Sequence, residues 1–123
     1  MADMDTSLKE AMQIDGAIGV ALVDYTSGMA LGTLGSGKDL DLGVAAAGNT
    51  EVVRAKMRTI DMLKLKDNIE DILITLSNQY HLIRPLTARN SQGLFLYVAL
   101  SRARANLAMA RHQMRKIEEE LQM

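Results

Sequence analysis

The sequence predicts a single α+β domain over residues 1–123, in which helices flank a five-stranded antiparallel sheet in the order α-β-β-α-β-β-β-α. Two observations carry this prediction. The spacing of the apolar residues alternates along the chain between the period of a helix and that of a strand. Short turns containing glycine, serine or asparagine separate the apolar runs of strand length. A length of 123 residues fits one domain rather than two.

The N-terminal part of the chain predicts a short helix followed by a β-hairpin. Ser7 and Glu10 have the spacing of a capping box, which favours a helix that begins at Ser7 and ends near Gly16. The run Ala17–Asp24 is rich in Val, Ile and Leu and has the length of a strand. The segment 29–34 returns after a turn that ends in glycine, so the two runs form a hairpin.

A long helix is predicted over residues 40–66, capped at its start by Asp39 or Asp41. Because Gly48 costs about 1 kcal/mol relative to alanine inside a helix, a kink or a late start near Asn49 is an alternative. The apolar residues that recur at helical spacing in its second half are Val53, Met57 and Ile60. The polar side of the same half carries Glu51, Arg54, Arg58 and Asp61.

The remaining elements are a three-stranded meander and a C-terminal helix. Apolar residues with a period of two predict strands at 70–76, 80–86 and 94–100. The apolar stripe of a helix over 103–121 consists of Leu107, Ala110, Met114, Ile117 and Leu121. Three glutamates at 118–120 lie where the helix dipole disfavours anions, so we expect the last turn to fray.

The hairpin and the meander join into one sheet most simply if the first strand pairs with the last. The segments 29–34 and 70–76 are then the sheet edges. The second of these carries Ile72 and Ile74 on one face and Leu73 on the other, and it lacks proline and lysine. An apolar edge of this kind invites pairing with another chain. Homodimerisation across it, with the helix 40–66 alongside, would cover this surface.

No residue pattern indicates catalysis or a metal site. The segment 32–38 fits the G-x-x-x-x-G-K core of a P-loop, but Asp39 stands where the Mg²⁺-binding Ser or Thr is required. We therefore interpret it as a glycine loop before a helix cap. His81 and His112 have no second His or Cys at ligand spacing, which favours structural histidines. The prediction is a protein that is not an enzyme and needs no cofactor or metal.

The charge balance and the cysteine count exclude several classes of protein. Fourteen basic against fifteen acidic residues give a net charge of −1, without the basic excess typical of nucleic-acid binding. The chain has no cysteine, which excludes disulfides and thiolate metal sites and suits a reducing compartment. The acidic start and the short apolar runs predict neither a secretory signal nor membrane insertion. We expect a cytoplasmic protein.

The order of elements and several segments resemble the Roadblock/LC7 domain. The segments that carry the resemblance are 15–24 with the turn to Gly28, the long second helix, the strands 69–76 and 80–86, and 105–111 at the start of the last helix. The resemblance covers the chain from about Ser7 to Leu121. In its compact form the chain looks most like the stand-alone roadblock proteins of actinobacterial conservons.

The resemblance implies a homodimer with one continuous sheet and with the second helices packed together. It also implies a bacterial, non-enzymatic regulator or scaffold that binds a Ras-like small GTPase, beside a sensor histidine kinase. Carried onto this chain, the candidate dimer contacts are Val53, Met57, Ile60, Ile72 and Ile74, with the first three divided between the interface and the sheet. The candidate partner contacts are Arg54, Arg58 and Asp61.

Two further hypotheses come from other functional classes. The first is a small-ligand sensory domain of PAS-like or profilin-like build, for which a sizeable enclosed pocket would speak. The second is a degenerate P-loop nucleotide-binding protein, for which the segment 32–38 would hold phosphate.

Overall fold

A computed structural model describes residues 2–35 and 40–122 of the chain. The elements are α1 (Met4–Met12), β1 (Ala17–Asp24), β2 (Met29–Gly35), α2 (Leu42–Met62), β3 (Ile72–Thr75), β4 (Gln79–Pro85), η1 (Arg89–Ser91), β5 (Leu94–Ser101) and α3 (Leu107–Glu120). Apart from η1, a single turn of 3₁₀ helix, their order is the one that the sequence predicts.

The five strands form one antiparallel sheet in the order β2-β1-β5-β4-β3. β1 pairs with β5 and so joins the N-terminal hairpin to the C-terminal meander, as predicted. β2 and β3 are the two edges. Pro85 lies opposite Phe95 at the end of β4, past the last pair that β4 makes with β3. Its missing N–H therefore costs the sheet no bond to β3.

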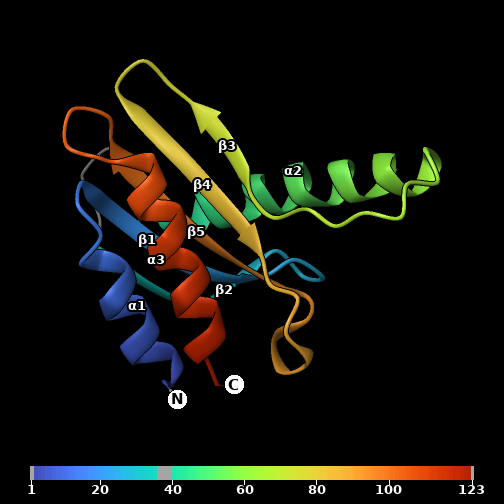
Figure 1. Cartoon of the computed structure of the whole chain (residues 1–123), viewed down its shortest axis with the longest axis horizontal. Coiled ribbons are helices and arrows are strands. Elements are labelled where there is room, and N and C mark those ends of the chain that lie inside the picture. Colours follow the sequence, from blue (N-terminus) through green and yellow to red (C-terminus); the bar gives the residue numbers. More distant parts are fainter. Residues whose placement is uncertain (1, 36–39, 123) are drawn as a thin grey trace.

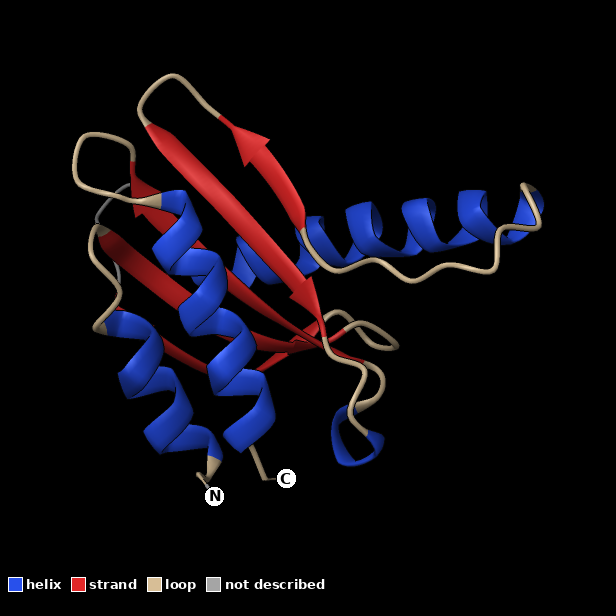
Figure 2. Ribbon diagram, in the orientation of Figure 1, coloured by secondary structure: helices blue, strands red, loops and turns tan. Residues whose placement is uncertain are grey.

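Helices cover both faces of the sheet (Figures 1 and 2). α1 and α3 lie side by side on one face, and α2 crosses the other. Successive residues of β5 alternate between the two cores, because side chains along a strand point to opposite faces. Leu96 and Val98 pack toward α1 and α3, whereas Phe95 and Tyr97 pack toward α2. The central strands are buried on both sides, and this explains their nearly continuous apolar sequence.

α1 begins earlier than the capping-box spacing predicts. Asp3 is the cap, and its carboxylate accepts a hydrogen bond from the Thr6 amide at 2.8 Å. This bond lowers the pKa of Asp3. Ser7 lies inside the helix and is buried, and its hydroxyl has no hydrogen-bond partner among the described residues. The predicted capping role of Ser7 is therefore wrong, because Asp3 caps the helix one turn earlier and places Ser7 in its interior.

α2 is capped by Asp41, whose carboxylate accepts from the amides of Gly43 and Val44. The other candidate cap, Asp39, lies outside the described residues. The helix runs through Gly48 without a break and ends at Met62, four residues before the predicted end. It closes with a Schellman motif, in which Lys64 takes the left-handed position with φ 58°.

The C-terminal end of α3 does not fray as the three glutamates predict. Glu118 is buried, and its carboxylate accepts from Arg84 Nε at 2.7 Å and from the Thr87 amide at 2.7 Å. Leu121 is buried as well, and it forms a parallel bridge with Ala2. An arginine on β4, distant in sequence, thus supplies the positive charge that the helix end lacks.

We predict that Glu118→Ala lowers the free energy of unfolding by about 3 kcal/mol. The side chains of Arg84 and Glu118 retain only 16% and 8% of their exposure, so removing one partner leaves a desolvated guanidinium and an unbonded amide. Urea denaturation measures the change. The matched control is Glu119→Ala at the exposed neighbouring position, with an expected loss of less than about 0.5 kcal/mol. Equal losses in the two variants would contradict this role for Glu118.

Candidate protein-interaction surface

The two halves of α2 differ in what they contact. In the first half, one stripe of residues packs against the sheet, and its buried members are Leu42, Ala46, Thr50 and Val53. Beyond Val53 no residue of α2 is buried within the described chain. Figure 1 shows the reason: the helix passes the start of β3 and continues beyond the edge of the sheet. We refer to residues 54–62 as the α2 arm.

The α2 arm carries the apolar stripe past the point where the sheet ends. Met57 and Ile60 continue the stripe that begins at Leu42, and both are only partly buried. At the tip, Met62, Leu63 and Leu65 are 75%, 60% and 53% exposed. Apolar side chains so exposed on an extended helix are a marker of a protein-interaction surface.

The edge strand β3 lies beside the arm and is apolar on both faces. Ile72 and Ile74 point to the α2 side of the sheet, whereas Leu73 points to the side of α1 and α3, as predicted. β4 occupies one edge of β3, and no described strand occupies the other. Alternate backbone groups of a strand point to each side, so β3 presents unpaired donors and acceptors next to the apolar arm.

The structure divides the candidate interface residues into two groups. Val53 has no exposed surface, because it packs on the sheet within the protomer, and it has nothing to offer a second subunit. Met57, Ile60, Ile72 and Ile74 all keep exposed surface on the arm or on the edge strand. The candidate dimer contacts therefore reduce to these four residues.

The three candidate partner contacts are exposed on the α2 arm. Arg54, Arg58 and Asp61 take part in no ion pair within residues 2–35 and 40–122. At 100° per residue, Arg58 lies about 160° around the helix from Ile60. Arg54 and Asp61 lie closer to the apolar stripe, about 60° and 40° from Met57. The three charged residues form a charged side that borders the stripe at Met57 and is centred away from Ile60.

A second feature beside α2 was not predicted as part of a site. His81 on β4 and Tyr97 on β5 form the floor of an open groove whose wall is α2. The His81 Nε2–H donates to Gln79 Oε1 at 2.8 Å, and the Tyr97 hydroxyl lies 3.3 Å from His81 Nδ1. The two rings meet edge to face with centroids 5.3 Å apart. Burial lowers the pKa of His81 and raises the pKa of Tyr97 to about 12.

A signal for this groove was present in the sequence. His81 and Ile83 share the parity that places side chains on one face of β4, and this face is the α2 side. A polar imidazole on the α2 side of the sheet therefore indicates a position that α2 does not cover.

The described residues do not build a phosphate-binding loop or a metal site. Gly32 and Gly35 belong to β2 and pair with Leu22 and Gly19 of β1, so this part of the P-loop-like segment is strand. The rest of it, including Lys38, lies outside the described residues. No group of three or more His, Asp or Glu side chains stands close enough to hold a metal ion in the part of the chain that the structure describes.

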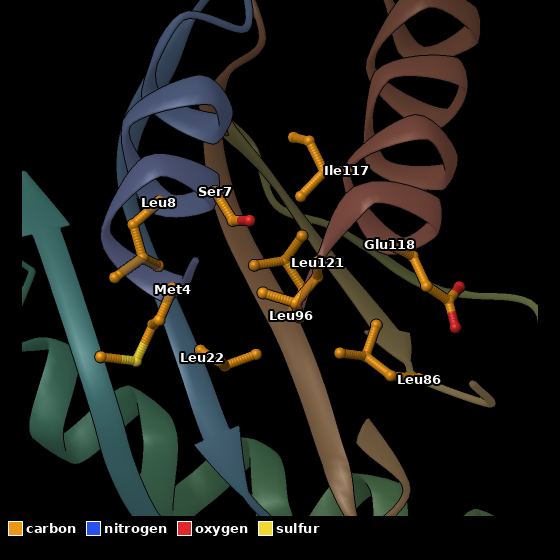
Figure 3. A pocket seen from close by; sticks show the side chains of 9 residues that line it. All are labelled: Met4, Ser7, Leu8, Leu22, Leu86, Leu96, Ile117, Glu118 and Leu121. Atoms are coloured by element: carbon orange, nitrogen blue, oxygen red, sulfur yellow. The ribbon is translucent and has the colours of Figure 1, made fainter. Parts of the chain in front are cut away.

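The cavity between α1, α3 and the sheet is too small for an organic ligand. It has a volume of about 10 Å³, close to the minimum for one water molecule. Leucines, Met4 and Ile117 line most of it, Ser7 stands at its wall, and the Glu118 carboxylate points away from Ser7 (Figure 3). Ligand sites occupy about 300–1,000 Å³, so this cavity gives no support to a ligand-sensing domain.

No protein-family profile and no curated protein matches the chain. Solved structures do match it. The Roadblock/LC7 domain from Streptomyces avermitilis has a TM-score of 0.79 at 13% identity, over 96% of this chain and 93% of that one. MglB from Myxococcus xanthus has a TM-score of 0.73 at 17% identity, over 94% of this chain and 85% of that one. MglC from Myxococcus xanthus has a TM-score of 0.59 at 18% identity, over 94% of this chain and 93% of that one.

These similarities show the fold: a small α+β domain in which helices cover both faces of a five-stranded antiparallel sheet. The chain has the Roadblock/LC7 fold, as the resemblance of its sequence segments implies. Among the described residues no helix has the length and apolar character needed to cross a membrane.

We predict that Val53→Ala lowers the free energy of unfolding by about 2 kcal/mol. The substitution removes two fully buried methyl groups and leaves a cavity between α2 and the sheet. The neighbouring Val52 is 37% exposed, and Val52→Ala is expected to cost less than half as much. Thermal or urea unfolding at a fixed protein concentration compares the two variants. A larger loss of unfolding free energy in Val52→Ala than in Val53→Ala would contradict the packing of Val53, rather than Val52, against the sheet.

Proposed function

We propose that this protein is a bacterial, cytoplasmic, non-enzymatic regulator or scaffold that acts as a homodimer and binds a Ras-like small GTPase. The observation that carries the proposal is the apolar α2 arm, which extends past an unpaired edge strand. The partner class follows from the Roadblock/LC7 resemblance. The same resemblance supports a sensor histidine kinase as a further component of the complex.

The dimer forms by antiparallel pairing of the two β3 strands about a two-fold axis. Such pairing satisfies the outward backbone groups of both strands and joins the two sheets into one. It also extends the sheet beneath each α2 arm, where Met57 and Ile60 are only partly buried in the protomer. The same two-fold pairing thus covers both the β3 edge and the apolar side of the α2 arm.

The other sheet edge is less suited to this pairing. β2 shifts register opposite Leu22 and Val23, and such a bulge disrupts a flat edge. Both α1 and α2 also contact β2. β3 has a regular register with β4 over its whole length.

In this dimer the charged side of the α2 arm stays exposed. Arg54 and Arg58 are one turn apart and lie about 120° and 160° around the helix from Ile60, which faces the second sheet. Arginine is enriched in protein interfaces, since its guanidinium forms several hydrogen bonds and also packs on apolar surface. We assign Arg54, Arg58 and Asp61 to the GTPase contact.

Ile60→Asp is expected to weaken the dimer at least 10-fold. A carboxylate buried without a partner costs more than the 1.4 kcal/mol that corresponds to a tenfold change in affinity. Sedimentation velocity over a concentration series measures the dissociation constant, and the wild type should sediment at twice the protomer mass of 13.5 kDa. A wild-type protein that sediments as a monomer at micromolar concentration would contradict the proposed homodimer.

Arg58→Glu is expected to weaken GTPase binding about 10-fold and to leave the dimer intact, because it reverses a charge at the partner contact. Calorimetric titration with a bacterial Ras-like GTPase, loaded with GDP or a non-hydrolysable GTP analogue, measures the affinity. The matched control is Arg115→Glu, the same charge reversal on exposed α3 across the sheet. Equal effects of the two variants would refute the assigned contact.

A further inference from the structure

The groove beside the first half of α2 lies on the α2 side of the sheet and is open to solvent. Val44, Ala45, Gly48 and Asn49 form its helical wall, and His81 and Tyr97 form its floor. Val44 is 69% exposed. No heavy atom lies within 4 Å of a Cβ built on Gly48, so the protomer itself does not require a glycine there. The groove is therefore a preformed space next to a helix with small side chains.

Antiparallel pairing of two β3 strands brings the arm of one copy to the groove of the other. The strand starts lie at opposite ends of the paired ladder, so each arm, which passes the start of its own β3, crosses the end of the partner strand (Figure 1). At that end, Ile74 stands opposite His81 on β4. A perpendicular two-fold axis keeps both α2 helices on the same face of the joined sheet.

The length of the arm matches this path. Nine residues of helix, 54–62, extend about 13 Å at 1.5 Å per residue. Neighbouring strands lie about 4.8 Å apart, so the arm spans two to three strand spacings beyond the β3 edge. This distance reaches the second copy's β4, which carries His81 on the groove floor.

We propose that His81 on the groove floor makes the dimer sensitive to pH, because the second copy's α2 arm covers this groove when the second helices pack together. The proposal rests on the proposed function, because it names a regulation of the same dimer. It also accounts for Gly48, whose missing side chain leaves room for the incoming arm.

The hydrogen bonds of His81 can form in both protonation states, so burial decides which state is favoured. Nε2–H donates to Gln79 in either state, and Nδ1 accepts from the Tyr97 hydroxyl in the neutral ring but donates to its oxygen in the cation. Burial already lowers the pKa of His81 in the protomer. Covering the ring with an apolar arm strips more water from the cation, so the dimer binds this proton more weakly than the monomer does.

The charged and titratable groups around the groove modify this effect without reversing it. From α2, Asp41 lines the groove, but its carboxylate accepts from the amides of Gly43 and Val44. From β5 comes the neutral Tyr97, and β3 contributes the apolar Ile74. The second copy's arm brings the three cations of residues 54, 56 and 58 against one anion, residue 61, which opposes a further positive charge on the imidazole.

The direction of the pH effect follows by linkage. Because the dimer binds fewer protons than two monomers, acidification through the pKa of His81 shifts the equilibrium toward monomers. Each imidazole contributes at most a factor of ten per pH unit, so the two histidines of a dimer contribute at most a factor of about 100 per unit. At neutral pH the neutral form dominates and the dimer is at its strongest.

Sedimentation equilibrium of the full chain at pH 7.5, 6.5 and 5.5 tests the pH dependence. We expect the wild-type dissociation constant to rise at least 10-fold between pH 7.5 and 5.5. His81→Gln should remove most of this rise, and His112→Gln, at the exposed second histidine on α3, should retain it. Circular dichroism checks that each variant is folded, and His81→Asn replaces the glutamine variant if that variant unfolds.

A second variant tests the groove independently of pH. Gly48→Phe fills the space where we place the arm and should weaken the dimer at least 10-fold at pH 7.5 with the protomer still folded. An unchanged dissociation constant would overturn the groove assignment. A pH-independent wild-type dimer, or the same pH dependence in His81→Gln, would overturn the role of His81 alone. A monomer at every pH would overturn the proposed dimer itself.

Discussion

The antiparallel pairing of β1 with β5 is the constraint on which the rest of the structure depends. It joins strands about 75 residues apart in sequence, which makes a single sheet of a hairpin and a meander that would each be marginal alone. Both strands are almost fully buried, so each supplies side chains to both cores. With β1 and β5 at the centre, β2 and β3 become the edges. The position of the interaction surface at β3 is thus a consequence of the central pairing.

Much of this fold could be predicted from the period of the apolar residues. The alternation in 70–76 identified both faces of β3, and the lack of any other simple way to join the strands identified it as an edge. The helix ends were missed where the deciding signal is not local or is atypical. Lys64 takes a left-handed position that glycine usually occupies, so no glycine marked the end of α2. Glu118 is neutralised by Arg84, 34 residues away, which no local rule about helix ends could include.

The sequence could predict which residues form the candidate site but not how deeply each of them is buried. Helical spacing grouped Val53 with Met57 and Ile60, since all three lie on one side of α2. The spacing could not show that the sheet buries Val53 fully but Met57 and Ile60 only in part, because the width of a sheet depends on pairings between distant strands. His81 was missed for a related reason: its neighbour Tyr97 comes from another strand, and only the register between β4 and β5 brings the two rings together.

The same α2 helix has to serve both the protomer core and the interaction surface, and this constrains its build. A helix segment of nine residues is marginal in water by itself, because nucleation is costly and its apolar side gains nothing from exposure. The arm persists because it continues a helix whose first half is already held by Leu42, Ala46, Thr50 and Val53 on the sheet. The core half therefore bears the nucleation cost, and the arm presents an ordered apolar stripe that a partner can bind with little further loss of backbone entropy.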